Sequence, residues 1–304
     1  MEKFRLHILG CGSALPTSVH NPSAQVLNIR EKLYMIDCGE GTQLQFRKSK
    51  LKFSRLTSVF ISHMHGDHCF GLVGIISTMA LLGRTADINV FLPKDGEEIV
   101  RAQLDYFCRD IPFNVNLVTF DGGEERMIFE DNSITVTTVP LKHRIACCGF
   151  LFREKQGLRH INREMCDFYG IPAFMIGKIK NGEDFVTEDG ETVANERITF
   201  PPDPVRSYAY CSDTIYMPEL EKQLKGIDLL YHEATFCNED VKRAKETYHT
   251  TSGEAAALAL KAEVKKLLIG HFSARYTDSN LLLRECRSIF RNTVAATEGL
   301  TVDI

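Results

Sequence analysis

The chain of 304 residues is long enough for one large α/β domain or two smaller ones, and its 44% hydrophobic and 25% charged residues are typical of a globular protein. Its net charge of -4 excludes a uniformly basic nucleic-acid-binding protein, so any contact with phosphate must come from local basic patches. The ten cysteines form no C-x-x-C pair, so we predict neither a disulfide framework nor a thiolate zinc site, as is usual in a reducing cytoplasm. We find neither a signal peptide nor an apolar run of transmembrane length, so we predict a cytoplasmic protein without a membrane partner.

The first predicted strand, residues 4–9, runs into a loop that contains Gly10 and Gly12. The loop superficially looks like a dinucleotide-binding turn, but it lacks a third glycine and Pro16 does not open a helix, so we reject that interpretation. A later strand pair ends at Asp37, before a predicted helix. That carboxylate fits either the wall of an active site or the cap of the helix.

A basic segment, residues 47–55, follows this helix. It contains five positive charges, no negative charge and Phe53. Two interpretations stay open: a solvated loop, or a surface that contacts phosphate, with Lys48 and Lys50 as candidate contacts.

The densest cluster of polar side chains is H-M-H-G-D-H at residues 63–68. It follows an apolar, β-branched run that predicts a buried strand, and the carboxyl end of a strand is where α/β sheets carry their chemistry. In an extended segment His63 and His65 project to the same side, while Asp67 and His68 can turn toward a second point. Packing needs no such cluster, so the pattern favours a metal site, and nitrogen and oxygen ligands suit zinc.

Later predicted strands also end in histidine or a carboxylate. His143 follows residues 133–139, Asp213 follows 207–211, Glu233 follows 229–231, and His271 follows 266–270. The recurring order is strand, polar residue, helix. We therefore predict an α/β fold with these side chains gathered at one edge.

Residues 155–206 differ from the rest, because glycines and prolines break the segment repeatedly. We predict one domain over residues 1–304 that carries this segment as a protruding insertion. Seven basic and nine acidic residues lie within it, so it is not a basic tail. Any contact with RNA would use one face or the backbone.

Seven side chains suit two metal ions that share one carboxylate. We predict His63, His65 and His143 on one ion, Asp67, His68 and His271 on the other, and Asp213 between them. Two ions about 3.5 Å apart lower the pKa of a bridging water and hold the attacking and departing oxygens of a phosphoryl displacement. Asp67 would adjoin that water and accept its proton.

The pattern H-x-H-x-D-H with its downstream His, Asp and His resembles the metallo-β-lactamase superfamily. Within it the chain is most similar to the ribonuclease Z family of tRNA 3′-processing endonucleases, over nearly its whole length. The motifs that carry this resemblance are G-E-G-T-Q at 39–43, P-L-x-H at 140–143, D-T at 213–214, H-E-A-T at 232–235, H-T-T at 249–251 and H-x-S-x-R-Y at 271–276.

The resemblance implies an αβ/βα four-layer sandwich, two Zn²⁺ per subunit with Mn²⁺ as the alternative ion, and a homodimer. It implies a metal-dependent endoribonuclease that removes the 3′ trailer of precursor tRNA, leaving a 3′-hydroxyl on the tRNA and a 5′-phosphate on the trailer. His249, oriented by Glu233, would stabilise or protonate the leaving oxygen, and a structural role for that pair is the other interpretation.

The same resemblance makes the insertion a flexible arm that grips the tRNA elbow. Lys178 and Lys180 are its candidate contacts, and Ser273 and Arg275 are candidates near the metal ions. At positions 173–174 the chain has Ala-Phe where bacterial relatives commonly have Gly-Pro, so the resemblance does not extend to the detail of this contact.

Three other functions fit the sequence less well. A phosphodiesterase for small phosphodiesters needs no arm, and a non-enzymatic RNA-binding relative would have lost ligands, whereas all seven are present. A β-lactamase is disfavoured by Asp213 at the bridging position and by the lack of a secretory signal. We predict the endoribonuclease, with the phosphodiesterase as the alternative.

Overall fold

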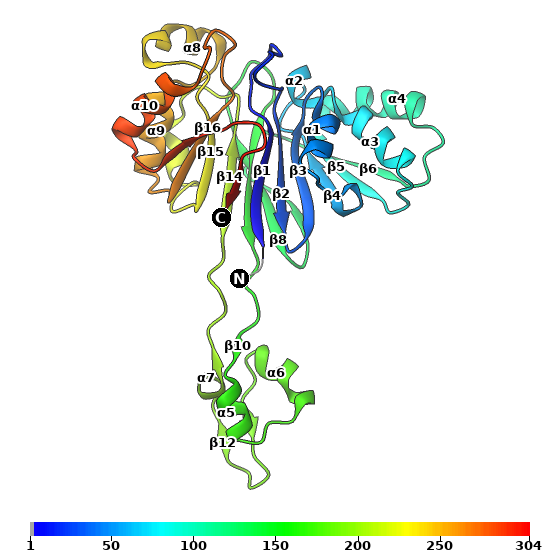
Figure 1. The fold of residues 1–304 in the computed structure, drawn as a ribbon, viewed down its shortest axis with the longest axis vertical. Coiled ribbons are helices and arrows are strands. Elements are labelled where there is room, and N and C mark those ends of the chain that lie inside the picture. Colours follow the sequence, from blue (N-terminus) through cyan, green and yellow to red (C-terminus); the bar gives the residue numbers. More distant parts are fainter. Residues whose placement is uncertain (1–2) are drawn as a thin grey trace. The chain divides into compact units, whose positions relative to one another are not determined.

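The computed structural model describes residues 3–304 (Figure 1). The chain divides into two compact units. The arm unit is Glu154–Val205, and the sandwich unit is formed by the residues up to Arg153 together with Arg206–Ile304. No helix within residues 3–304 combines the length and the apolar character that crossing a membrane requires.

The sandwich unit contains two sheets of seven strands each. In spatial order, the first sheet consists of β18 (Thr301–Asp303), β1 (Phe4–Gly10), β2 (Ala24–Ile29), β3 (Lys32–Cys38), β4 (Leu56–Phe60), β5 (Ile88–Pro93) and β6 (Val115–Phe120). The second consists of β17 (Thr293–Ala295), β16 (Lys266–Gly270), β15 (Leu229–Glu233), β14 (Ser207–Cys211), β9 (Cys148–Glu154), β8 (Ile134–Pro140) and β7 (Met127–Glu130). Strands β3 to β6 run parallel, and so do β14 to β17, so that their carboxyl ends meet at common edges.

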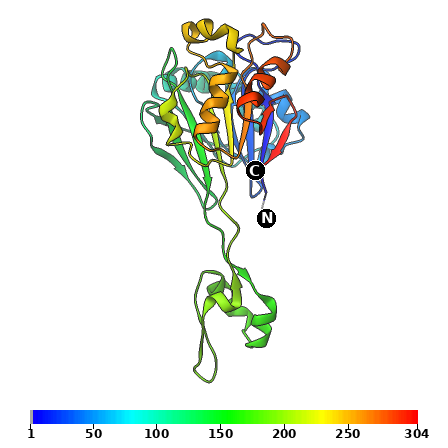
Figure 2. The same cartoon turned by 90° about the vertical axis from the view of Figure 1, so that its left-hand side faces the viewer.

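Helices cover the outer faces of both sheets (Figure 1). The first sheet carries α1 (Thr42–Lys48), α3 (Leu72–Leu81) and α4 (Glu97–Phe107), and the second carries α9 (Ser252–Lys261) and α10 (Asn280–Ile289). The helices α2 (Gly66–Cys69) and α8 (Val241–Thr247) lie at the upper ends of the strands. Figure 2 shows α9 and α10 in front of the strands of the second sheet. Short 3₁₀ helices occur at Phe53–Arg55, Lys94–Gly96, Ala173–Met175, Pro218–Glu221 and Asn238–Asp240. The order helix, sheet, sheet, helix confirms the predicted four-layer sandwich.

Aromatic side chains join the two sheets. Phe60 of β4 is fully buried, and its ring centroid lies 5.6 Å from that of Phe150 and 5.4 Å from that of Phe152, both on β9. Within the first sheet Phe60 also stacks on Phe91 of the neighbouring strand β5, with 4.6 Å between the ring centroids. Burial of such rings supplies much of the driving force for packing one sheet on the other.

The close approach of β9 to its neighbouring strand β14 depends on Gly149. A Cβ atom at this position would lie 2.2 Å from the carbonyl oxygen of Tyr210. We expect Gly149→Ala to lower the free energy of unfolding by about 1–3 kcal/mol, as overpacking of a core does. Urea unfolding measures this, with Gly177→Ala as the control, because a Cβ there meets nothing within 4 Å. Equal midpoints for both variants would contradict the packing argument.

The arm unit has a small core of its own. Its elements are β10 (His160–Ile161), α5 (Arg163–Phe168), α6 (Ile176–Lys180), β11 (Phe185–Val186), β12 (Thr192–Val193), α7 (Asn195–Ile198) and β13 (Thr199–Phe200). The buried side chains Cys166, Ile179, Phe185, Val193 and Ile198 pack together. The Asn195 side-chain amide is buried and donates to the carbonyl oxygens of Ile179 (2.8 Å) and Glu183 (2.7 Å), which fixes the turn between them.

Candidate metal centre

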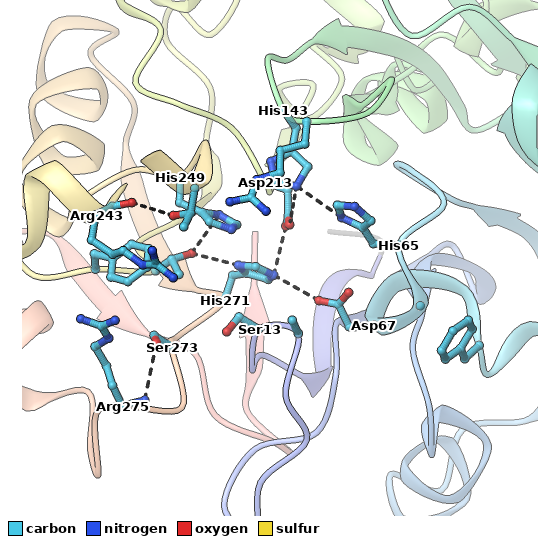
Figure 3. A pocket seen from close by; sticks show the side chains of 17 residues that line it. Ser13, His65, Asp67, His143, Asp213, Arg243, His249, His271, Ser273 and Arg275 are labelled. Atoms are coloured by element: carbon cyan, nitrogen blue, oxygen red, sulfur yellow. Dashed lines mark hydrogen bonds and ion pairs between the residues drawn. The ribbon is translucent and has the colours of Figure 1, made fainter. Parts of the chain in front are cut away.

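The predicted ligands lie together at the carboxyl ends of strands from both sheets. His63 and His65 follow β4, Asp67 and His68 belong to the short helix α2, His143 follows β8, Asp213 follows β14, and His271 follows β16. In Figure 3, His65, Asp67, His143, Asp213 and His271 point toward one another. The edges of two facing sheets thus bring together residues that are up to 208 positions apart in the sequence.

The first group consists of His63, His65, His143 and Asp213, whose donor atoms all lie within 4.8 Å of one another. His65 Nδ1 is 3.0 Å from His63 Nε2 and 3.3 Å from His143 Nε2. The Oδ2 atom of Asp213 lies 3.6 Å from His63 Nε2 and 3.7 Å from His143 Nε2. Three imidazole nitrogens and one carboxylate oxygen therefore surround a single point.

The second group consists of Asp67, His68 and His271, again within 4.8 Å. The Nε2 atoms of His68 and His271 lie 3.4 and 3.5 Å from Asp67 Oδ2. They lie 3.2 and 3.1 Å from Asp213 Oδ1. Asp213 thus turns one oxygen to each group.

A divalent cation fits these groups. His68 Nε2 and His271 Nε2 are buried and make no hydrogen bond, although carboxylate oxygens lie close to both. A buried polar atom normally has a hydrogen-bond partner. Ring nitrogens that lie near carboxylates without such a bond therefore indicate a cation site between the nitrogens and the carboxylates. Neutral imidazoles with carboxylates form a donor set typical of zinc and related ions.

The backbone is strained where two of these side chains begin. Asp213 has φ 52° and His271 has φ 59°, in the left-handed region that residues with a Cβ avoid. Asp37, at the end of β3, has φ 55°. Such outliers persist only where the surrounding structure enforces them, and they concentrate at functional sites.

Asp37 holds His68 in place. Its buried carboxylate accepts hydrogen bonds from His68 Nδ1 (2.7 Å), Tyr210 Oη (2.6 Å) and both the amide and hydroxyl of Ser62 (2.8 and 2.9 Å). With Nδ1 engaged, His68 turns Nε2 toward the second group. The alternative that Asp37 caps a helix is wrong, because α1 begins after Gly41 without a side-chain cap.

We expect Asp37→Asn to weaken metal binding about 10–100-fold, because an amide offers one acceptor oxygen where the carboxylate accepts four hydrogen bonds. Competition with a chelator measures the affinity. Asp228→Asn is the matched control, since the Asp228 carboxylate also accepts from the amide and hydroxyl of a serine, Ser207, but lies at the opposite end of β15. Equal affinities in the two variants would show that Asp37 does not orient a ligand.

His249 and Glu233 form a buried pair beside the second group. Glu233 ends β15 and accepts from His249 Nδ1 at 2.8 Å and from the amides of Thr214 and Thr250 at 2.7 and 3.1 Å. Burial disfavours the imidazolium form of His249, but the charge and hydrogen bond of Glu233 outweigh this and raise the pKa of His249 to about 9. Thr235 links the pair to the ligands, because its hydroxyl lies 2.5 Å from Glu233 Oε2 and 2.9 Å from His271 Nδ1.

A central pocket of about 530 Å³ opens onto both groups. Its polar lining includes Ser13, His65, Asp67, His143, Arg144, Asp213, Arg243, His249, His271, Ser273 and Arg275 (Figure 3). Arg275 lies over the Phe236 ring, 5.0 Å from its centroid, and contacts Asp240 Oδ1 at 3.1 Å. Three arginines around one pocket favour an anionic ligand.

The remaining candidates are the proposed RNA-contacting residues, and they differ in whether they line the central pocket. Ser273 and Arg275 line the central pocket, whereas Lys48 and Lys50, both exposed, are absent from its lining. Lys178 and Lys180 belong to α6 of the arm unit. The sequence did not identify two arginines that line the pocket, Arg144 and Arg243. Arg144 directly follows the candidate ligand His143, and that position could have indicated it. Arg243 lies within α8, where no local sequence pattern marks it.

Known proteins resemble the chain along its whole length. Ribonuclease Z of Bacteroides fragilis is 57% identical over 304 residues, which cover all of both chains. The crystal structure of the short form of human tRNase Z has a TM-score of 0.69 at 24% identity and covers 98% of each chain. That of the metallo-β-lactamase fold protein YhfI from Bacillus subtilis has a TM-score of 0.70 at 17% identity and covers 100% of each. The two solved structures show that the fold is that of the metallo-β-lactamases.

A family model described as Anti-Pycsar protein Apyc1 matches residues 4–157. The matched stretch contains the first five candidate ligands and ends before Asp213, His249 and His271. The match to the Bacteroides fragilis relative extends over these later positions as well, and so carries the assignment.

Proposed function

Because this chain belongs to the ribonuclease Z family, we propose that it is the metal-dependent endoribonuclease that removes the 3′ trailer from precursor tRNA. Cleavage would leave a 3′-hydroxyl on the tRNA and a 5′-phosphate on the trailer. The observation that carries the proposal is the position of Asp213, which turns one carboxylate oxygen to each of two ligand groups, beside the His249–Glu233 pair.

As a ribonuclease Z the chain binds divalent metal, and the proposed ions are two Zn²⁺ per subunit, with Mn²⁺ as the alternative. His63, His65 and His143 would hold one ion, Asp67, His68 and His271 the other, and Asp213 both. When bound, the ions supply Lewis-acid activation of water and neutralise charge on the phosphoryl oxygens.

Asp67 and His249 are suited to move the two protons of the reaction. Asp67 lines the central pocket, with its Oδ2 atom 3.4 and 3.5 Å from Nε2 of His68 and His271, and this position suits its carboxylate to accept a proton from the attacking water. His249 is engaged by Glu233 through Nδ1, which leaves Nε2 to donate a proton to the departing 3′-oxygen of the tRNA. Glu233 acts as the positioning residue, because it holds the imidazole and stabilises its charged form.

Cleavage of a precursor tRNA with a labelled 3′ trailer tests the proposal. A single cut near the discriminator nucleotide, with a 3′-hydroxyl on the upstream product, is the expected result. Fast hydrolysis of bis(p-nitrophenyl) phosphate without any cut in the precursor would favour the small-molecule phosphodiesterase instead.

The proposed RNA contacts fall into two classes. Ser273 and Arg275 would hold the phosphates that flank the cleavage site, since both line the central pocket. Lys178 and Lys180 of the arm unit would contact the tRNA elbow. Lys48 and Lys50 are not in the lining of the pocket, so they would contact only the body of the tRNA.

An exposed apolar patch supports the proposed homodimer. Phe70 (74% exposed), Ile99 (57%), Tyr106 (74%) and Phe107 (65%) lie after α2 and on α4. Phe70, Ile99 and Phe107 line one groove, and Phe70 also lines the central pocket. Large contiguous apolar surfaces mark association sites, and a second copy of the chain would cover this one next to the metal centre.

We expect Phe107→Asp to convert the dimer to a monomer, because a carboxylate in the groove would be buried without a partner on association. Light scattering during gel filtration gives the mass in solution. Phe174→Asp is the matched control, since Phe174 is another exposed phenylalanine (81%) but belongs to the arm unit. A monomeric control, or a dimeric Phe107→Asp, would exclude this patch as the specific interface.

We also propose a cytoplasmic location, which the free thiols of the cysteines in residues 3–304 support.

A further inference from the structure

A third cluster of metal-ligating groups lies outside the metal centre. Cys11 follows β1, His20 lies in the loop that leads to β2, and Glu298 lies between β17 and β18. Their sulphur, nitrogen and oxygen atoms all lie within 4.8 Å of one another. We propose that Cys11, His20 and Glu298 bind a further divalent cation of the zinc class, with a structural role.

The donor atoms lie close to the spacing that such an ion requires, with the contact between His20 and Glu298 slightly shorter. Cys11 Sγ lies 3.4 Å from His20 Nδ1 and 3.8 Å from Glu298 Oε1, and His20 Nδ1 lies 3.1 Å from Glu298 Oε2. Ligands at 2.0–2.3 Å from a tetrahedral zinc ion are about 3.3–3.8 Å apart. Ring nitrogens of the first group also lie at or slightly below the lower end of that range, at 3.0 and 3.3 Å.

The chemistry of the three groups differs from that of the metal centre. Cys11 is fully buried and its thiol donates to the carbonyl oxygen of Ala296 at 3.4 Å. A cation would displace the thiol proton to solvent and leave a thiolate, as zinc does with its cysteine ligands. The side chains of His20 and Glu298 are 15% and 16% exposed, so water can reach the cluster and complete the coordination.

The position of the cluster explains what an ion would do there. It would join the end of β1 to the loop before β2 and to the C-terminal turn, across 287 positions of sequence. Ser13, two residues after Cys11, lines the central pocket, and its amide donates to the carbonyl oxygen of Phe272, which follows His271. The ion would therefore stiffen the wall of the pocket without facing the substrate.

A hydrogen-bonded cluster without an ion is the competing interpretation. The contacts among the three side chains, with the amide of Asn21 donating to Glu298 Oε1 at 2.8 Å, would hold the loop by themselves. The two interpretations differ in one observable, a sulphur–metal bond.

Cobalt substitution of the untagged full chain separates the two interpretations. The seven proposed ligands of the metal centre offer only nitrogen and oxygen, so an absorption band from thiolate-to-cobalt charge transfer would report a sulphur ligand outside that set, and the cysteine variants identify which one. The wild type and the control Cys108→Ser, which changes another buried thiol, should show the band. Cys11→Ser should lose the band and contain one ion fewer per chain.

His20→Gln provides a second, milder test, because glutamine keeps a hydrogen bond to Glu298 and leaves the thiol in place. We expect it to contain one ion fewer than the wild type as well. The absence of a thiolate band from the wild type, its persistence in Cys11→Ser, or equal metal contents in all variants would overturn the proposal. Neither readout involves RNA cleavage, so the result is independent of the proposed function.

Discussion

His249→Ala is expected to lower kcat for cleavage of precursor tRNA by about 10²–10⁴-fold, the usual contribution of a general acid, while the metal content stays unchanged. The reason is geometric: Nδ1 of His249 is engaged by Glu233 at 2.8 Å, which leaves one nitrogen to face the pocket. Single-turnover cleavage gives the rate, and elemental analysis gives the metal content of the same preparation.

The matched comparison is His143→Ala, which removes a proposed ligand that lines the same pocket. That variant should lose metal as well as rate. The distinction matters because a ring nitrogen of His249 lies within 4.8 Å of donor atoms of Asp213 and His271, which is close enough for all three to bind one ion. If His249→Ala loses metal, His249 is a metal ligand and the assignment as the general acid is wrong.

Removal of the arm unit is expected to raise the KM for precursor tRNA on the order of 100-fold, which corresponds to a loss of about 3 kcal/mol of binding. Hydrolysis of a small phosphodiester should be unchanged, because every residue that lines the central pocket belongs to the sandwich unit. The deletion is feasible, since Arg153 and Ser207 pair directly in the antiparallel strands β9 and β14. A short glycine-containing turn can therefore close the gap.

Comparison of the two substrates shows which role the arm unit has. A collapse of both activities would mean that the unit supports the fold. Lys178→Glu should produce part of the increase in KM, because it reverses one proposed contact to phosphate. Glu188→Gln, at another exposed position in the same unit, should leave the KM for tRNA unchanged.

The strand-end residues were the most predictable part of the molecule. Apolar runs locate β4, β14 and β16, and parallel strands place their carboxyl ends at one edge, so His63, Asp213 and His271 could be brought together without coordinates. The role of Asp37 could not be decided, because one residue at the end of a strand has the same local sequence whether it caps a helix or holds a histidine. Only the hydrogen bond to His68, 31 positions away, separates the two.

Contacts between distant loops left no trace in the sequence. Cys11 and Glu298 meet because β1 and β18 are neighbours in the first sheet, a pairing of the first and last strands that no local period reveals. Arg243 is similar, since its place in the pocket depends on how α8 packs, and an arginine within a helix is ordinarily a solvent-facing residue.

The left-handed backbone at Asp213 and His271 implies a trade between stability and activity. A glycine adopts φ near 55° without the steric cost that a residue with a Cβ carries there, about 1–3 kcal/mol for each strained position. The chain thus carries an aspartate and a histidine at two positions where folding alone would favour glycine. The carboxylate and the imidazole therefore lower the stability of the fold, and a ligand that binds them only in the folded state would offset that loss.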